Sequence, residues 1–302
     1  MAKLIQWFPG HMKKAMRDME EKRALCDGVI CVLDSRAPIA TYNPKLPEIF
    51  AGKPVLYVLN KSDLSDGKSE KFAAMIEAQG KPCVAISAVN GASRRVLEKR
   101  LQILTKEKRE RAESKGVTRR FRYTVVGIPN TGKSTVVNLL GGAKRAKTGD
   151  IAGVTRDVRW IKCADFDLLD TPGTMPPSCK TQYLARHLAY IGSLNDDILD
   201  IADVALELLK ELKANYPAAL QERYGIDCGG NNAETDKTAD EEERTREAVE
   251  MLETACRRRG FILRGGEFDY ERGARAVIDD FRKGRLGKIC LDNPSDFADV
   301  KF

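Results

Sequence analysis

The sequence predicts an α/β domain with a mostly parallel sheet, followed by a smaller, mainly α-helical domain. The first observation behind this prediction is that short apolar runs alternate with helical patterns from residue 29 to residue 170, as in βαβ units. The second is that beyond Pro177 the apolar residues recur only at helical spacing. The 302 residues are enough for two domains, which we expect to span residues 1–177 and 178–302.

Six segments of the first domain have the composition of strands in a sheet that helices cover. They are residues 29–34, 55–60, 83–87, 123–127, 158–163 and 166–170. Residues 93–122, which separate the third segment from the fourth, are highly basic. Their apolar residues recur at helical spacing before the pattern becomes polar, so we expect a helix that runs into a linker.

The second domain is expected to consist of helices, with apolar helical patterns in residues 199–209, 248–255 and 270–283. The apolar face of the last helix should consist of Ala274, Val277, Ile278 and Phe281. Gly284 is placed to end that helix. Residues 229–243 are rich in Gly, Asn and acidic residues, which predicts a mobile loop.

Composition excludes several classes of protein. No apolar run approaches the roughly 20 residues of a membrane-spanning helix, and the N-terminal segment lacks the features of a signal peptide. We therefore expect a cytoplasmic protein with no membrane partner. The eight cysteines include no CxxC pair and the chain has only two histidines, which disfavours a thiolate zinc site. The net charge of +7 indicates an anionic partner.

Residues 127–134, GIPNTGKS, match the phosphate-binding pattern GxxxxGK[ST] between a predicted strand and a predicted helix. Glycines let the backbone wrap around phosphates, and the helix N-terminus offers unpaired N–H groups. Lys133 supplies a positive charge to the β- and γ-phosphates, and the Ser134 hydroxyl is a ligand for Mg²⁺. The residues of this loop that we assign to the nucleotide are Asn130, Thr131, Gly132, Lys133, Ser134 and Thr135.

Two further segments complete a site for Mg²⁺ and the γ-phosphate. Asp170 ends a predicted strand and begins a DxxG element, which places its carboxylate near the metal and the Gly173 N–H near the γ-phosphate. Between this element and the phosphate loop, Thr155 offers a hydroxyl to Mg²⁺ from a loop that could order around the γ-phosphate. The predicted metal ligands are therefore Ser134, Thr155 and Asp170, and we assign Lys133 and Thr155 to catalysis as well.

The NKSD segment that ends the second predicted strand indicates that the base is guanine. The Asp63 carboxylate can accept hydrogen bonds from guanine N1–H and the exocyclic amine, and adenine has neither group. Asn60 braces the loop, and the stem of Lys61 can lie over the base. Ser87 and Ala88, at the end of the third predicted strand, supply a backbone N–H to the guanine carbonyl oxygen. These segments together predict binding of GTP and GDP.

The guanine-reading segments precede the phosphate-binding segments, the reverse of their order in small GTPases, so we predict a circularly permuted P-loop GTPase domain. Further segments match one family: QWFPGHM at 6–12, DSRAP at 34–38, PNTGKS at 129–134, GVTR at 153–156, GEFDYER at 266–272 and DFRKGRLG at 280–287. With these segments the chain resembles the ribosome biogenesis GTPase A (YlqF/RbgA) family over nearly its whole length.

The resemblance implies a GTP-hydrolysing factor in maturation of the large ribosomal subunit, whose partners are the precursor of that subunit and its rRNA. It also implies that His11 orients the attacking water; alternatively, His11 belongs to a packed or RNA-facing N-terminal segment. Resemblance to potassium-dependent GTPases suggests that the Asn130 side chain helps to hold K⁺, the alternative being an amide that braces the loop. Thr174 stands where Ras-like GTPases place a glutamine, so we expect slow hydrolysis without an activator.

The basic residues cluster near the N-terminus, in residues 94–122 and in residues 257–288. We interpret the last cluster as an rRNA-binding surface on which Arg272, Arg275 and Arg282 meet phosphates. Two other functions stay open: a permuted GTPase that acts on the small subunit, and an RNA-binding scaffold that uses GTP as a structural ligand. We expect a monomer.

Overall fold

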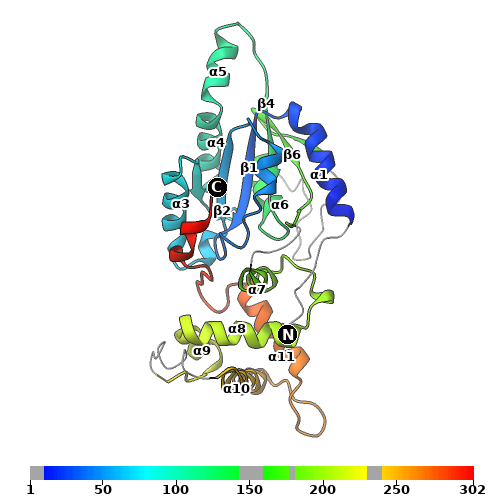
Figure 1. Ribbon diagram of the computed structural model, residues 1–302, viewed down its shortest axis with the longest axis vertical. Helices are drawn as coiled ribbons and strands as arrows, with labels where there is room; N and C mark the ends of the chain where they lie inside the picture. The colour runs from blue at the N-terminus through cyan, green and yellow to red at the C-terminus, as the bar shows by residue number, and fades with distance from the viewer. Residues whose placement is uncertain (1–9, 143–158, 177–180, 230–239) are drawn as a thin grey trace. The chain divides into compact units, whose positions relative to one another are not determined.

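The computed structural model describes residues 10–142, 159–176, 181–229 and 240–302, and Figure 1 shows its ribbon. The chain forms two compact units. The first comprises the residues up to Leu188 together with Gly192–Leu194 and Cys290–Phe302, and the second comprises Ala189–Ile191 and Asn195–Ile289. This division differs from the expected boundary at residue 177, because the chain returns to the first unit near its C-terminus. No helix within the described ranges is long and apolar enough to cross a membrane.

The first unit contains a six-stranded sheet in the order β3-β2-β1-β4-β6-β5, as far as the described residues show. Its strands are β1 (Gly28–Asp34), β2 (Val55–Asn60), β3 (Cys83–Ala85), β4 (Phe121–Val126), β5 (Arg159–Lys162) and β6 (Phe166–Asp170). All neighbouring pairs are parallel except β5 and β6, which confirms the mostly parallel sheet. In register, Asp34 lies beside Asn60, and Val125 beside Asp170. Polar side chains from three strands therefore meet at the carboxyl edge of the sheet, where α/β folds bind ligands.

Helices cover both faces of this sheet (Figure 1). They are α1 (Gly10–Lys22), α2 (Lys45–Ile49), α3 (Lys68–Ala78), α4 (Ser93–Leu104) and α6 (Lys133–Gly141). The next helix along the chain is α7 (Gln182–Tyr190), whose last two residues belong to the second unit. Alternate residues of β1 point to opposite faces. Ile30 packs with residues of α4 and α6, whereas Cys31 packs with residues of α1, α2 and α3. Each β1 face therefore contributes to a separate apolar core.

The basic stretch between β3 and β4 is helical over more of its length than we expected. After α4 the chain continues into α5 (Lys106–Glu113), which extends past the end of the sheet (Figure 1). No residue of α5 is buried. Its sequence KEKRERAE consists of good helix formers, and this favours a helix even without an apolar face.

The C-terminal residues of the chain are part of the first unit. Phe297, in the 3₁₀ segment η4 (Pro294–Asp299), is buried in the same core as Phe72, and its ring stacks on that of Phe302 at 5.3 Å. Phe302 also stacks on Tyr42 at 4.1 Å. Earlier in the same segment, the Asp292 carboxylate accepts a hydrogen bond of 3.1 Å from the N–H of Ala40. Residues 290–302 thus complete a core whose other buried members lie in the first half of the chain.

The second unit is helical, as predicted, and consists mainly of α8 (Ile201–Asn215), α9 (Pro217–Tyr224), α10 (Glu241–Arg259) and α11 (Tyr270–Arg282). The four residues that we predicted for the apolar face of α11 are all buried. Gly284 follows α11 with a positive φ of 68°, which confirms its role at the helix end. The predicted loop 229–243 lies mostly outside the described residues. The last residues of this range are not a loop as predicted, because α10 begins at Glu241, with Asp240 as its N-cap.

Candidate functional site

The phosphate-binding segment lies between β4 and α6, as predicted, and its glycines are required by close packing. Gly127 and Gly132 have φ values of 153° and 89°. A Cβ atom on Gly132 would collide with the side-chain amide of Asn60, and one on Gly127 with the carbonyl oxygen of Val32. The backbone therefore approaches the neighbouring strands closely, and the first N–H groups of α6 are placed to bind an anion.

Lys133 is the buried cation of this loop. Its Nζ donates a hydrogen bond of 2.7 Å to the carbonyl oxygen of Ile128. Burial lowers the pKa of Lys133 to about 8, although the nearby Asp170 carboxylate opposes the shift. A Cβ atom on Gly173 would lie 2.9 Å from Nζ, so the predicted lysine and the predicted γ-phosphate sensor are adjacent.

Asp170 is fully buried at the end of β6, and neither of its carboxylate oxygens has a hydrogen-bond partner among the described residues. Burial raises the pKa of Asp170, while the positive charges of Lys133 and Arg159 oppose the shift. The one ion pair of Asp170 in the described part of the chain is a long contact of 4.0 Å with Arg159. A buried carboxylate without a hydrogen-bond partner is costly and suits a cation. With the half-buried Ser134 at the start of α6, this donor set fits Mg²⁺, a metal that often completes its coordination with nucleotide phosphates and water.

Among the described residues, no group of three or more His, Cys, Asp or Glu side chains could hold a metal by itself. The predicted ligand Thr155 lies outside those residues.

Asn60 connects three segments of the base side. Its Nδ2 donates to the carbonyl oxygen of Thr131 at 3.0 Å, and its Oδ1 accepts from the N–H of Ala88 at 3.0 Å. These contacts give Asn60 the bracing position that we expected. They also occupy the Ala88 N–H, which we had assigned to the guanine carbonyl oxygen.

Asp63 is exposed in the short 3₁₀ helix η2 (Ser62–Leu64). The Ser62 N–H donates to the carbonyl oxygen of Ile86 at 3.0 Å, which ties this helix to the start of the loop that contains Ser87. The carbonyl oxygen of Ser87 in turn accepts from the Ser93 hydroxyl at 2.8 Å. The predicted guanine-reading groups therefore lie on two neighbouring loops, and the Asp63 carboxylate faces solvent.

A buried ion pair that sequence reasoning did not assign holds Lys61. Its Nζ lies 2.8 Å from Asp34 and donates to the carbonyl oxygen of Asn130 at 2.5 Å. Arg36 binds Asp34 through two N–H groups at 3.0 and 2.9 Å. Burial alone would raise the pKa of Asp34, but the two cations hold it well below its usual range. The sequence signal was available, because Asp34 ends an apolar run just as Asp170 does.

Asn130 braces the phosphate loop. Its side-chain Nδ2 donates to the carbonyl oxygen of Gly192, and the Ser193 hydroxyl donates to that of Pro129 at 2.7 Å. The loop-bracing alternative therefore has a contact in the structure, and the role of Asn130 toward K⁺ stays a prediction.

Thr174 is fully buried and its hydroxyl has no hydrogen-bond partner within the described parts of the chain. Its carbonyl oxygen accepts from Asn43 at 3.1 Å. His11 lies in α1, but its side chain is outside the described residues. The proposed orientation of water by His11 therefore stays a prediction.

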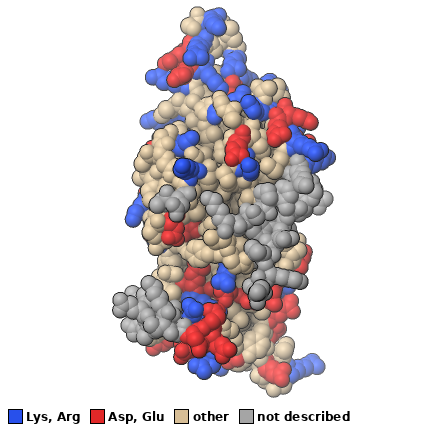
Figure 2. All heavy atoms as spheres, in the orientation of Figure 1, with Lys and Arg blue, Asp and Glu red and all other residues tan. Residues whose placement is uncertain are grey.

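Part of the predicted rRNA-binding cluster is used inside the second unit. Arg282 donates to both carboxylate oxygens of Asp196 at 2.7 Å and to the carbonyl oxygens of Ala189 and Tyr190, so the prediction that it meets phosphates is wrong. Arg275 is more exposed and pairs with Glu271 at 3.1 Å. Three other arginines surround the buried carboxylate of Asp280: Arg223, Arg259 and Arg285. Acidic side chains are also prominent on the face of the second unit that Figure 2 shows.

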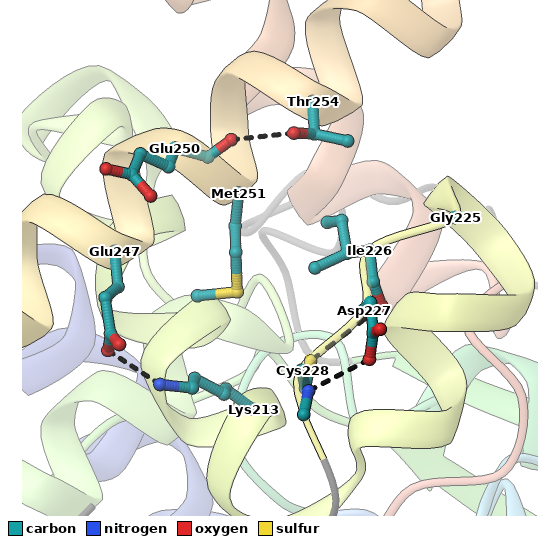
Figure 3. A pocket seen from close by; sticks show the side chains of 10 residues that line it. Lys213, Gly225, Ile226, Asp227, Cys228, Glu247, Glu250, Met251 and Thr254 are labelled. Carbon is teal, nitrogen blue, oxygen red and sulfur yellow. Dashed lines mark hydrogen bonds and ion pairs between the residues drawn. The ribbon is translucent and has the colours of Figure 1, made fainter.

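A pocket of about 410 Å³ in the second unit has the wrong charge for a nucleotide (Figure 3). Glu247, Glu250 and Asp227 line it, and Lys213 is paired with Glu247 at 2.6 Å. Burial raises the pKa of the Cys228 thiol, which keeps this side chain neutral. This pocket is therefore not a candidate for the nucleotide site.

Comparisons with known proteins show the family to which the chain belongs. A family model described as 50S ribosome-binding GTPase matches residues 122–226, a range that starts at the strand before the phosphate loop and leaves out the NKSD segment. Ribosome biogenesis GTPase A of Bacillus cereus is 36% identical over 98% of this chain and 96% of its own length. The Thermotoga maritima relative of the same name is 28% identical, with 98% and 97% covered. The GDP-bound structure of TM YlqF matches with a TM-score of 0.62 and 25% identity over 93% of this chain and 100% of that one. The chain therefore belongs to the ribosome biogenesis GTPase A family and is a circularly permuted GTPase.

Proposed function

We propose that this GTPase acts in maturation of the large ribosomal subunit by binding the precursor of that subunit and its rRNA. The observation that carries the proposal is the meeting of guanine-reading and phosphate-binding segments at one sheet edge, in a chain similar over nearly its full length to proteins named ribosome biogenesis GTPase A. We further propose that it acts as a monomer in the cytoplasm.

In this proposal the nucleotide is GTP or GDP with Mg²⁺, and the residues predicted to bind phosphate and metal keep their roles, as does Asp63. Lys133 binds the β- and γ-phosphates, and Ser134, Thr155 and Asp170 hold the metal, which would offset phosphate charge when bound. The buried carboxylate of Asp170, which has no hydrogen-bond partner among the described residues, supports its part. The exposed carboxylate of Asp63 supports its contact with guanine.

Hydrolysis in the isolated protein is proposed to be slow. A water-orienting group must reach the attacking water, and the Thr174 hydroxyl is buried. The ribosomal partner would therefore have to position such a group, and His11 is the residue that we propose for this role. A change in the phosphate loop can reach the second unit along the chain. Residues 192–194 brace the phosphate loop, and residues of the second unit flank them in the chain.

The test is GTP turnover measured alone, with purified small subunits and with purified large subunits or their precursors. We expect stimulation by the large subunit or its precursor. Stimulation by the small subunit alone would support the small-subunit alternative, and turnover that neither subunit changes would support the scaffold alternative.

A further inference from the structure

The segment that connects α10 to α11 is an ordered hairpin with its own hydrogen bonds. Asp269 N–H donates to the carbonyl oxygen of Phe261 at 3.0 Å, and Leu263 N–H donates to that of Glu267 at 2.8 Å. Gly265 and Gly266 turn the chain with φ values of 115° and 88°, which other residues adopt only with strain. We call residues 261–269 the α10–α11 hairpin; it projects from the helices of the second unit (Figure 1).

Two large aliphatic side chains are exposed next to the turn of this hairpin. Ile262 is 51% exposed and Leu263 is 49% exposed. Single exposed aliphatic residues are common on protein surfaces, but two adjacent ones on a projecting turn form a small apolar contact surface. Such a surface favours a partner that offers flat or apolar groups.

Exposed arginines surround the apolar pair. The Arg272 guanidinium lies 4.4 Å from the ring centroid of Phe261, and that of Arg257 lies 5.3 Å from the ring centroid of Phe268. These cation–π contacts hold both arginines beside the hairpin while their residues remain exposed. Arg264 is exposed in the turn itself. The exposed acidic residue of the hairpin is Glu267, because Asp269 is partly buried and caps α11.

These arginines differ from most others of the second unit, although Arg258, next to Arg257, is also exposed. Arg259, Arg282 and their neighbours are paired with Asp280 or Asp196. By contrast, no ion pair among the described residues involves Arg257, Arg264 or Arg272. Within the second unit, the arginines without an ion pair among the described residues therefore lie in the hairpin or next to it.

We propose that the α10–α11 hairpin binds unpaired nucleotides in an RNA loop or bulge. Ile262 and Leu263 pack against exposed base faces, while Arg257, Arg264 and Arg272 bind the phosphates on either side. An unpaired RNA segment presents base faces and phosphates together, whereas an A-form duplex hides its base faces and has a major groove too narrow for side chains. This inference rests on the proposed function only in taking the RNA to be ribosomal.

The experiment uses the full-length protein and two fluorescein-labelled RNAs: a stem–loop with an unpaired loop, and a fully paired duplex of equal length. Fluorescence anisotropy gives the dissociation constant of each at several KCl concentrations. We expect tighter binding of the stem–loop. Replacing both apolar residues, Ile262→Ser with Leu263→Ser, should weaken stem–loop binding about tenfold by removing apolar contact, without changing its salt dependence.

Arg264→Ala should act differently, since it removes a phosphate contact. The slope of log affinity against log salt should fall by about 0.7, the value for one contact to a single strand. Arg246→Ala is the matched control, because Arg246 is an exposed arginine on α10 outside the hairpin. It should leave the affinity nearly unchanged. An unchanged far-UV circular dichroism spectrum and thermal unfolding curve would show that the second unit of each variant is folded.

Equal binding of the stem–loop by wild type and hairpin variants would overturn the inference, as would a preference of the wild type for the duplex. Loss of binding to ribosomal subunits with unchanged stem–loop affinity would also overturn it, by showing that the hairpin contacts a protein. Failure of the proposed function looks different: the large subunit would not stimulate GTP turnover although the hairpin still binds the stem–loop.

Discussion

At the scale of single residues, the phosphate site is built from charges that the protein itself does not fully compensate. Lys133 and Asp170 are both buried, and burial shifts the pKa of each toward its neutral form. Buried charges cost free energy unless they are paired. A ligand with phosphate anions and a divalent cation would compensate both charges, so the site is preorganised for a metal–nucleotide complex at a cost to the free protein.

The titration of Lys133 gives a testable pH dependence. Its pKa of about 8 in the free protein means that the side chain is charged at pH 7 and mostly neutral at pH 9. Phosphate binding favours the charged form, so above pH 8 binding must take up a proton. We expect the dissociation constant for GDP to rise about tenfold between pH 7 and pH 9.

Fluorescent GDP measured at both pH values would check this dependence. Lys133→Arg is the control, because arginine keeps its charge at both pH values while any titration of the nucleotide stays the same. The expectation is contradicted when the wild type and the arginine variant lose affinity equally.

At the scale of elements, sequence periodicity predicted those helices and strands that depend on nearby residues in the chain. The strand segments and the apolar face of α11 follow from alternation and helical spacing, and both are confirmed. The return of residues 290–302 to the first unit could not be predicted, because Phe72, whose ring contacts Phe297, lies more than two hundred positions earlier in the chain. The ion pair of Lys61 with Asp34 escaped prediction for a similar reason: it depends on the register of two neighbouring strands.

The C-terminal segment should stabilise the first unit measurably. Phe297 is 4% exposed, and replacing a buried phenylalanine by alanine usually costs about 3 to 5 kcal/mol of unfolding free energy. We expect Phe297→Ala to lower the unfolding free energy by about 3 kcal/mol in urea titrations followed by circular dichroism. Leu25→Ala, at a side chain 46% exposed, should change it by less than about 0.5 kcal/mol. Equal effects of the two variants would mean that the segment is not part of the core.

At the scale of the whole molecule, permutation changes which part of the chain follows the γ-phosphate sensors. In this order the DxxG element leads within a few residues to α7, and from there to Gly192–Leu194 and the second unit. The Ser193 hydroxyl binds the carbonyl oxygen of Pro129 inside the phosphate loop. A change in the phosphate loop on GTP hydrolysis can therefore reach the helices of the second unit through Gly192 and Ser193. These two residues contact the loop and are covalently continuous with the second unit.

This route predicts that Ser193→Ala uncouples the second unit from the nucleotide. Hydrogen exchange of α8 amides would be compared with GDP and with a non-hydrolysable GTP analogue bound. We expect the exchange rates of the α8 amides to differ between the two nucleotide states in the wild type and to be equal in Ser193→Ala. The affinity for GDP should change little, because Ser193 contacts the phosphate loop from outside. Ser69→Ala is the matched control, because Ser69 is a buried serine of α3 whose hydroxyl has no hydrogen-bond partner among the described residues. If Ser193→Ala keeps the full wild-type difference, the nucleotide signal must reach the helices by another route.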